Sequence, residues 1–184
     1  MSLATVLQVG DPRLRSNCAR VDNIADAAFQ KECARLHQAL AAFRKMEGFG
    51  RAIAAPQIGI EKRLIAMNLG DGPFSVINPE MTYRSEETMT LWDDCMSFPW
   101  LLVRVRRHCS ITVTFQNQEG ERQEWARMDP ARSELFQHEM DHLNGVLALD
   151  HAMDRNAIIS RQVFETDPGP FRDQVDFGSV YGAE

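Results

Sequence analysis

The feature of this 184-residue sequence that most restricts its fold is a pair of histidines, His138 and His142, with Glu139 directly after the first. Side chains at positions i and i+4 share one face of an α-helix, so both imidazoles can reach a single point if this segment is helical. Glu139 would then project beside that point. The HExxH pattern therefore predicts a helix that carries two metal ligands, with Glu139 as the general base toward a water molecule at the metal.

A mononuclear catalytic centre needs a third protein ligand and one position left open for water. The residues alone leave several candidates for that ligand, which are Cys18, Cys33, Cys95, Cys109, His37, His108 and His151. Cys95 has the best context, because it lies between two strand-like segments and close to the turn that Pro99 enforces. The other three cysteines are better interpreted as small buried hydrophobic residues. His37 and His151 are interpreted as structural.

Two helices are expected from the periodicity of the apolar residues. They recur at spacings of three and four from about Ile24 to Met46, which predicts an amphipathic helix. A second helix is expected over roughly Ala131–Asn144, around the two histidines, and Gly145 would end it. A last, short helix is predicted over Arg155–Glu165, followed by an irregular tail after Pro168.

Between the first two helices the sequence is typical of short β-strands, several of which alternate apolar and polar residues. The predicted strands are Arg63–Leu69, Phe74–Asn78, Met81–Thr90, Leu101–Arg107, Ser110–Asn117 and Arg122–Arg127. Gln118–Gly120 predicts a hairpin turn between the last two. Because the helices are segregated from the run of strands, the sequence indicates an α+β domain.

The composition excludes several classes of protein. A formal net charge of -6 and a pI near 5.4 argue against a dedicated nucleic-acid binder and against a polybasic membrane anchor. We expect no signal peptide and no transmembrane helix, because no apolar run is long enough. The four cysteines form no CxxC pair, so a reducing cytoplasm is the simplest setting.

Three segments together resemble the motifs of the peptide deformylase family. The family's GxGxAAPQxG corresponds to Gly50–Gly59, its EGCLS to Asp93–Ser97, and its QHExDHLxG to Gln137–Gly145, in the same order. A single HExxH sequence has real false positives, whereas three ordered motifs are very hard to obtain by chance. Shorter matches extend the resemblance over roughly residues 5 to 155, namely Val6–Gln8, Asp11–Leu14 and Ile77–Pro79.

The resemblance implies an enzyme that removes the N-formyl group from the initiator methionine of new polypeptides and releases formate. The metal ligands would be Cys95, His138 and His142, usually with Fe²⁺, and Zn²⁺, Ni²⁺ or Co²⁺ could occupy the same site. The implied fold has small antiparallel or mixed sheets packed around a central HExxH-bearing helix, with an N-terminal helix and a short C-terminal one. All of residues 1–184 would form one catalytic domain, with its core at about residues 5–155.

The resemblance also assigns catalytic roles. Glu139 would act first as the base and then as the acid toward the leaving amine. Gln57 and the backbone N–H of Met96 would hold the oxyanion of the tetrahedral intermediate, which suits a reaction that develops charge on an amide oxygen. Residues 50 to 53 would border a groove in which the substrate backbone pairs with a strand edge.

The residues expected at the substrate are Gly50, Ala52, Ile53 and Asp94, and two of them depart from the family's pattern. Ala52 and Asp94 each stand where the family has glycine, so both add bulk near the substrate. Asp93 replaces the family's glutamate, which pairs with an arginine; the candidate partners here are Arg104, Arg106 and Arg107. Our hypothesis is that these changes alter substrate preference or activity and leave the metal ligands and the base intact.

The expected partners are N-formylated nascent peptides, without direct nucleic-acid or membrane binding. A basic, ribosome-facing patch at Arg104–His108 is a weaker interpretation than a solvated strand face. Three alternative functions remain: hydrolysis of another formamide or small amide, silent binding of metal or formylated peptides, and proteolysis. The presence of Glu139 favours catalysis over silent binding, and Gln57 and the context of Cys95 count against a metalloprotease.

Overall fold

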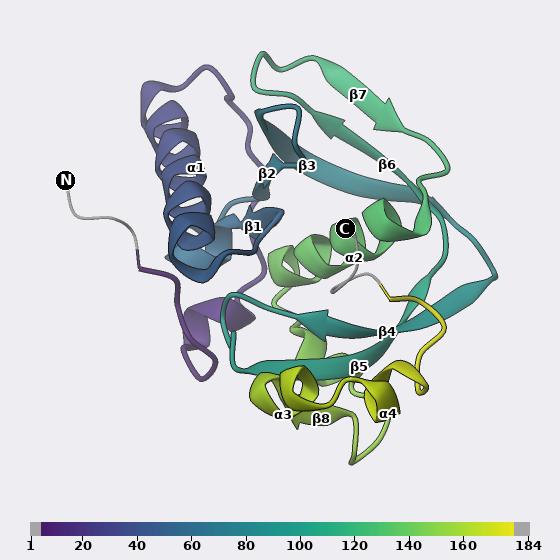
Figure 1. The fold of residues 1–184 in the computed structure, drawn as a ribbon. Helices are drawn as coiled ribbons and strands as arrows, with labels where there is room; N and C mark the ends of the chain where they lie inside the picture. The colour runs from purple at the N-terminus through teal and green to yellow at the C-terminus, as the bar shows by residue number, and fades with distance from the viewer. Residues whose placement is uncertain (1–4, 179–184) are drawn as a thin grey trace.

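The computed structural model describes residues 5–178 (Figure 1). Its helices are α1 (Ala27–Glu47), α2 (Pro130–Leu143), α3 (Arg161–Thr166) and α4 (Gly169–Arg172). Its strands are β1 (Ala52–Ala54), β2 (Leu64–Asn68), β3 (Pro73–Arg84), β4 (Thr88–Asp94), β5 (Leu101–His108), β6 (Ile111–Gln116), β7 (Arg122–Trp125) and β8 (Ile158–Ser160). Short 3₁₀ helices are η1 (Pro12–Arg15), η2 (Ala55–Ile58) and η3 (Ala148–His151).

Two sheets surround helix α2. The larger sheet has the strand order β1-β2-β3-β6-β7 and the smaller one the order β4-β5-β8, and neighbouring strands pair antiparallel in both. Helix α2 contacts β1 of the larger sheet and β5 of the smaller one, and it runs through the middle of the molecule in Figure 1. The predicted α+β architecture around a central HExxH-bearing helix is therefore confirmed.

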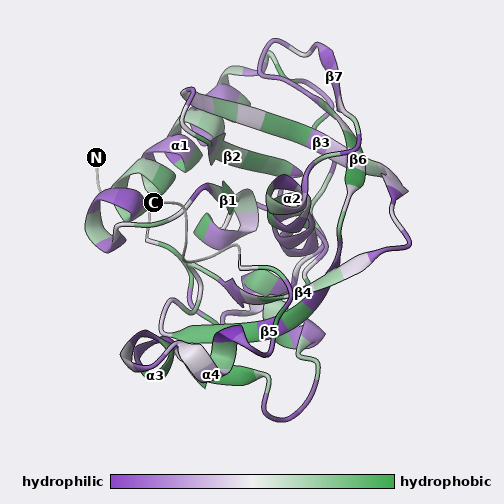
Figure 2. Cartoon of the chain, turned by 45° about the vertical axis from the view of Figure 1, so that its right-hand side comes forward, coloured by the Kyte–Doolittle hydropathy of each residue, from purple (hydrophilic) through white to green (hydrophobic). Residues whose placement is uncertain are grey.

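Strand β2 shows why the larger sheet carries a helix on each face. Leu64 and Ala66 pack in the cluster that includes α1, whereas Ile65 and Met67 pack in the cluster that includes α2. Successive side chains of a strand point to opposite faces, so a strand that is buried on both faces needs a continuous apolar run. Figure 2 shows such hydrophobic stretches along β2 and β3.

The smaller sheet is covered on both faces as well. Leu91 and Val103 point into a cluster that also contains Cys95, while Trp92 and Leu102 point to the opposite face. Phe164 of α3 covers that opposite face. The C-terminal segment thus shields the sheet that leads into Cys95.

An aspartate N-cap sets the start of each of the two long helices. Asp26 accepts a hydrogen bond from the backbone N–H of Phe29 at 3.0 Å, and Asp129 accepts one from that of Arg132 at 3.0 Å. An aspartate at the N-cap satisfies a helix donor that has no partner within the helix, so α1 begins at Ala27 rather than near Ile24.

No helix within residues 5–178 combines the length and apolar character needed to span a membrane.

Two predicted strands have the wrong boundaries. The sequence predicts separate strands at Phe74–Asn78 and Met81–Thr90. In the structure β3 continues through Pro79 to Arg84, and residues 85–87 connect it to β4. Strand β3 continues because its register against β6 shifts near Pro79, and such an irregularity accommodates a residue that cannot donate to the ladder.

The predicted helix over Arg155–Glu165 is wrong in its first half. Residues 158–160 form strand β8, in which Ile159 pairs with Leu102 of β5, and only the following residues form the short helix α3. The apolar side chains that favoured a helix extend the smaller sheet instead, because pairing with an available strand edge outweighs local preference. The tail that we predicted to be irregular contains α4, and residues 179–184 lie outside the described residues.

Candidate metal centre

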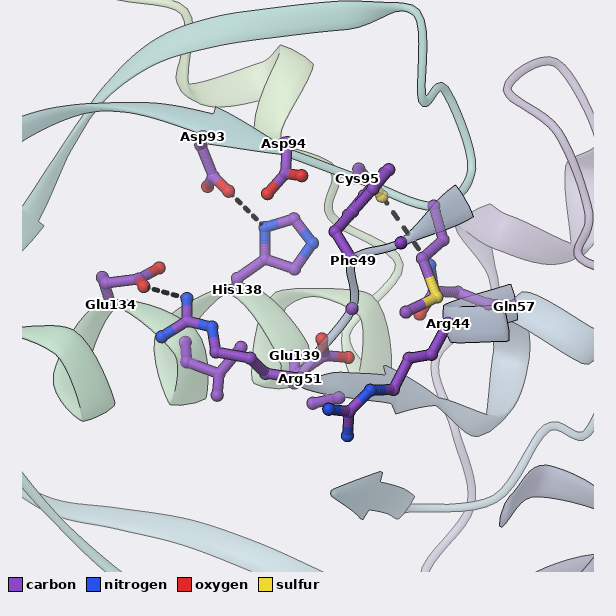
Figure 3. A pocket seen from close by; sticks show the side chains of 15 residues that line it. Arg44, Phe49, Arg51, Gln57, Asp93, Asp94, Cys95, Glu134, His138 and Glu139 are labelled. Carbon is purple, nitrogen blue, oxygen red and sulfur yellow. Dashed lines mark hydrogen bonds and ion pairs between the residues drawn. The ribbon is translucent and has the colours of Figure 1, made fainter. Parts of the chain in front are cut away.

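The structure brings the three predicted metal ligands together. The Sγ atom of Cys95 lies 3.3 Å from Nε2 of His142, which lies 3.2 Å from Nε2 of His138. Potential ligand atoms of the three residues all lie within 4.8 Å of one another, and all three side chains are buried. Helix α2 supplies the two histidines, and the residue directly after β4 supplies the cysteine. Figure 3 shows Cys95 and the first of these histidines, His138.

This donor set fits a divalent transition metal. One thiolate and two imidazoles are ligands that zinc and iron accept, and three ligands leave a fourth position open. Burial lowers the pKa of His142 to about 3, which keeps its imidazole in the neutral form that binds metal. Two imidazole nitrogens that face each other across 3.2 Å in a buried site need a cation or a proton between them.

Asp93 joins this cluster to a buried ionic network. Its Oδ1 atom lies 2.9 Å from Nδ1 of His138, and its Oδ2 atom accepts a hydrogen bond from Arg107 at 3.1 Å. Arg107 also pairs with Asp141 of α2. Of the three arginines predicted as partners of Asp93, the structure selects Arg107. Burial opposes the charge on Asp93, but His138 and Arg107 hold its pKa well below the usual range.

The contact with Asp93 has a chemical consequence for His138. A carboxylate on the far ring nitrogen of a histidine ligand fixes the tautomer and the orientation of the ring. The shorter side chain at position 93 therefore still reaches both a histidine and an arginine. Sequence reasoning named the arginine contact and missed the one to His138.

Glu139 follows His138 directly on α2 and lines the same cavity as His138 and Cys95. Its side chain is buried, and its Oε2 atom has no hydrogen-bond partner among the described residues. Burial raises the pKa of Glu139 to about 7. A carboxylate with a pKa near the working pH can both accept and return a proton, which is the property that a general acid–base requires.

Gln57 is held with its amide nitrogen toward the cluster. Its Oε1 atom accepts a hydrogen bond from the backbone N–H of Ala54 at 2.9 Å. Its Nε2 atom donates to Ser97 at 3.2 Å and lies 3.7 Å from Sγ of Cys95. Because the side chain is almost fully buried and fixed at both ends, its N–H₂ group is a preorganised donor next to the thiol.

A cavity adjoins these groups, and most residues predicted at the substrate line it. Gly50, Ala52, Asp94 and Met96 border this cavity together with Gln57. Gly50 has a φ of +115°, and a Cβ atom there would overlap the side chain of Met96. Glycine is therefore favoured at this position by its backbone conformation, whereas the overlap involves only the terminal methyl group of Met96, which can move.

The structure places the side chain of Ile53 away from this cavity. It is fully buried in the cluster that packs against α1, and it does not line the cavity. The backbone of Ile53 nevertheless belongs to β1, which is the terminal strand of the larger sheet. The main-chain N–H and C=O groups of Ile53 are directed to Ala66 of β2, so at the free edge of β1 the neighbouring Ala52 offers its backbone instead.

Asp94 is braced by a residue outside all three motifs. Its Oδ2 atom pairs with Nη2 of Arg161 at 2.9 Å, and the same guanidinium lies 4.4 Å from the ring centroid of Phe49. Arg161 also donates to the carbonyl oxygen of Pro99. The C-terminal segment thus holds the rim of the cavity, which no sequence signal indicated.

Gln137 anchors the histidine-bearing helix to the end of β5. Its Oε1 atom accepts from the backbone N–H of His108 at 3.0 Å, and its Nε2 atom donates to the carbonyl oxygen of His108 at 3.0 Å. His108, an alternative ligand, therefore lies outside the cluster, as do His37, which contacts Ser75 at 2.9 Å, and His151. The glutamine that precedes HExxH was the available signal for this anchor.

Gly145→Ala should destabilise the protein, because this glycine follows the histidine-bearing helix α2 and packs against η1. Gly145 has a φ of +70°, and an added Cβ atom would overlap the backbone carbonyl of Arg15. The conformation alone costs about 1–2 kcal/mol for alanine, and the overlap adds to it. Gly48→Ala, with a φ of +80° and open space around its Cβ position, is the matched control. Equal unfolding free energies for the two variants in denaturant titrations would refute the packing argument.

The α+β fold and a buried cluster of Cys95 with the two histidines of an HExxH helix define the class of this protein as a metallohydrolase. The family model described as polypeptide deformylase matches residues 3–157. The chain belongs to the polypeptide deformylase family, which confirms the predicted resemblance.

Individual relatives agree with this assignment. The chain is 38% identical over 154 residues to a peptide deformylase of Thermotoga neapolitana, with 83% of this chain and 89% of the relative covered. The crystal structure of peptide deformylase from Thermotoga maritima matches with a TM-score of 0.75 and 34% identity, over 84% of this chain and 100% of that one. A peptide deformylase from Synechococcus elongatus, solved in complex with actinonin, matches with a TM-score of 0.76 and 30% identity, over 84% and 81%.

Proposed function

We propose that this protein hydrolyses the N-formyl group from the N-terminal methionine of newly made polypeptides and releases formate. Membership of the deformylase family supports the reaction. The observation that carries it is a buried Cys-His-His cluster, of which Cys95 and His138 line one cavity together with a buried carboxylate and a fixed amide donor. Such a set provides a metal site, a base and a donor for the developing charge of an amide substrate.

Cys95, His138 and His142 are the proposed metal ligands. A bound divalent cation would polarise the formyl carbonyl and make a water molecule a better nucleophile near neutral pH. We propose Fe²⁺ as the metal in the cell, with Zn²⁺, Ni²⁺ or Co²⁺ able to occupy the site in purified protein. The backbone N–H of Ser97 lies 3.5 Å from Sγ of Cys95 and would stabilise the thiolate form.

Glu139, Gln57 and Met96 are the proposed catalytic residues. Glu139 takes a proton from the attacking water and returns it to the leaving amine, which a pKa of about 7 allows. The fixed N–H₂ group of Gln57 and the backbone N–H of Met96 donate hydrogen bonds to the oxygen that becomes negative as the carbonyl carbon turns tetrahedral. Because Gln57 is held by Ala54 and Ser97, it needs little reorganisation during the reaction.

The peptide is proposed to lie along the edge of β1. Gly50 and Ala52 line the cavity on that side, and Asp94 lines it from the end of β4. The main-chain N–H and C=O groups that face the free edge of β1 are those of Ala52, because Ile53 pairs with Ala66 of β2, so Ala52 is the residue available for pairing with an extended substrate. The whole chain is proposed to form one catalytic domain that acts on formylated nascent peptides in the cytoplasm. Docking near the ribosome exit stays a prediction.

The proposed reaction is tested by formate release from formyl-Met-Ala-Ser. Protein stripped with a chelator should release no formate above background, and restoring Fe²⁺ under anaerobic conditions should restore the activity. Formate release that is unaffected by chelation, or absent after verified reloading with metal, would contradict the proposal. Binding of the formylated peptide without turnover would instead favour the silent relative that the sequence left open.

A further inference from the structure

An ion pair of Arg51 and Glu134 lies in the wall of the catalytic cavity. Glu134 belongs to the first half of α2, four residues before His138, so both side chains share one face of the helix. Arg51 lies just before β1 and reaches across to this carboxylate (Figure 3). A group bound at the metal cluster therefore has this ion pair as its neighbour along the helix.

The ion pair is asymmetric in its exposure. The Glu134 side chain is only 4% exposed, whereas the Arg51 side chain is 41% exposed. Arg51 also donates to the backbone carbonyl of Ala131 at 3.2 Å. A guanidinium has five N–H donors, and these two contacts use two of them. Arg51 thus places a fixed guanidinium in the cavity wall, and this group can still donate a hydrogen bond to an acceptor on a bound molecule.

Stability does not explain this ion pair. Removing a carboxylate from water is expensive, and a buried pair is often no better than well-packed apolar residues of the same size. Charged residues recur around the cavity, which is lined by Arg44, Arg51, Asp93, Asp94, Glu134 and Glu139. An apolar thioether side chain placed against Arg51 and Glu134 would remove water from charged groups without replacing their hydrogen bonds.

We infer that Arg51 and Glu134 form the subsite for the side chain next to the formyl group, and that this subsite favours a polar, acceptor-bearing side chain over methionine. This inference rests on the proposed deformylation and refines its substrate. The preferred substrate class is an N-formyl peptide whose first side chain carries an amide or a comparable acceptor. The guanidinium of Arg51 donates to that acceptor, and Glu134 holds the guanidinium in place.

The test compares formyl-Gln-Ala-Ser with formyl-Met-Ala-Ser, because glutamine and methionine have similar length and neither is charged. With the metal-loaded wild-type protein, we expect kcat/KM for the glutamine peptide to exceed that for the methionine peptide by about tenfold or more, since a site built for hydrogen bonding rejects an analogue that lacks the partner. In the double variant Arg51→Met/Glu134→Leu the ratio should invert in favour of methionine.

A matched control is the double variant Arg20→Met/Glu80→Leu, which removes an ion pair of the same residue types that does not line this cavity. Its ratio should equal that of the wild type. A wild-type preference for formyl-Met-Ala-Ser overturns the inference and leaves deformylation intact, and it does so even if the Arg51/Glu134 variant fails to fold. A folded Arg51/Glu134 variant with an unchanged ratio also overturns it. Absence of formate from both peptides overturns the proposed function together with this inference.

Discussion

Glu139→Gln should lower kcat for formate release by about 10²–10⁴-fold, the range that a positioned general acid–base contributes. The amide has nearly the shape of the carboxylate but cannot accept a proton. The neighbouring cluster of Cys95, His138 and His142 keeps all its ligand atoms. Metal content, measured by elemental analysis of the purified variant, should therefore stay equal to that of the wild type.

A matched control is Glu80→Gln, which makes the same chemical change at an exposed side chain. This variant should retain wild-type kcat. If Glu139→Gln kept full activity at unchanged metal content, the proton would have to travel through another group, and the assignment of Glu139 as the base would be wrong. A parallel loss of metal would instead assign Glu139 to metal retention.

Arg107→Met should lower the free energy of unfolding by about 3–5 kcal/mol, the cost of removing one partner from a buried ionic network. Arg107 is only 4% exposed and pairs with both Asp93 and Asp141. Methionine fills much of the same volume but leaves those two carboxylates without their shared cation. Equilibrium denaturation with urea, at pH 7 and with the metal removed from both proteins, measures the effect.

The neighbouring Arg106→Met variant is the control for this prediction. Arg106 lies on the same strand but is exposed, so its replacement should change stability by at most about 0.5 kcal/mol. Equal stabilities for the two variants would show that the network around Arg107 contributes no more than a surface charge. A loss confined to the Arg107 variant supports the network, which also orients His138 through Asp93.

The metal centre could be predicted because its residues carry short-range signals. His138 and His142 follow the helical repeat, so their common direction is fixed by local geometry alone. Cys95 was proposed from its context and from the family resemblance, and the structure places its sulfur 3.3 Å from His142. Fold class was predictable for a similar reason, since alternation and helical periodicity are local properties.

The residues that were missed depend on contacts between distant segments. Arg161 lies far along the chain from Asp94, and no pattern in the sequence connects them. A glutamate in an amphipathic helix is expected to be exposed. Glu134 is instead buried, because helix α2 lies between two sheets. The wrong helix before α3 has the same origin, because Ile159 finds a strand edge that only the tertiary fold provides.

The most direct test of the central claim is X-ray absorption at the metal K-edge of the Fe²⁺- or Zn²⁺-loaded protein. We predict one sulfur scatterer at about 2.3 Å and two imidazole nitrogens, with a lighter ligand completing the shell. Cys95→Ser should remove the sulfur signal, whereas Cys109→Ser should leave it unchanged, because Cys109 lies outside the cluster. A first shell of nitrogen and oxygen alone in the wild-type protein would contradict the Cys95–His138–His142 centre.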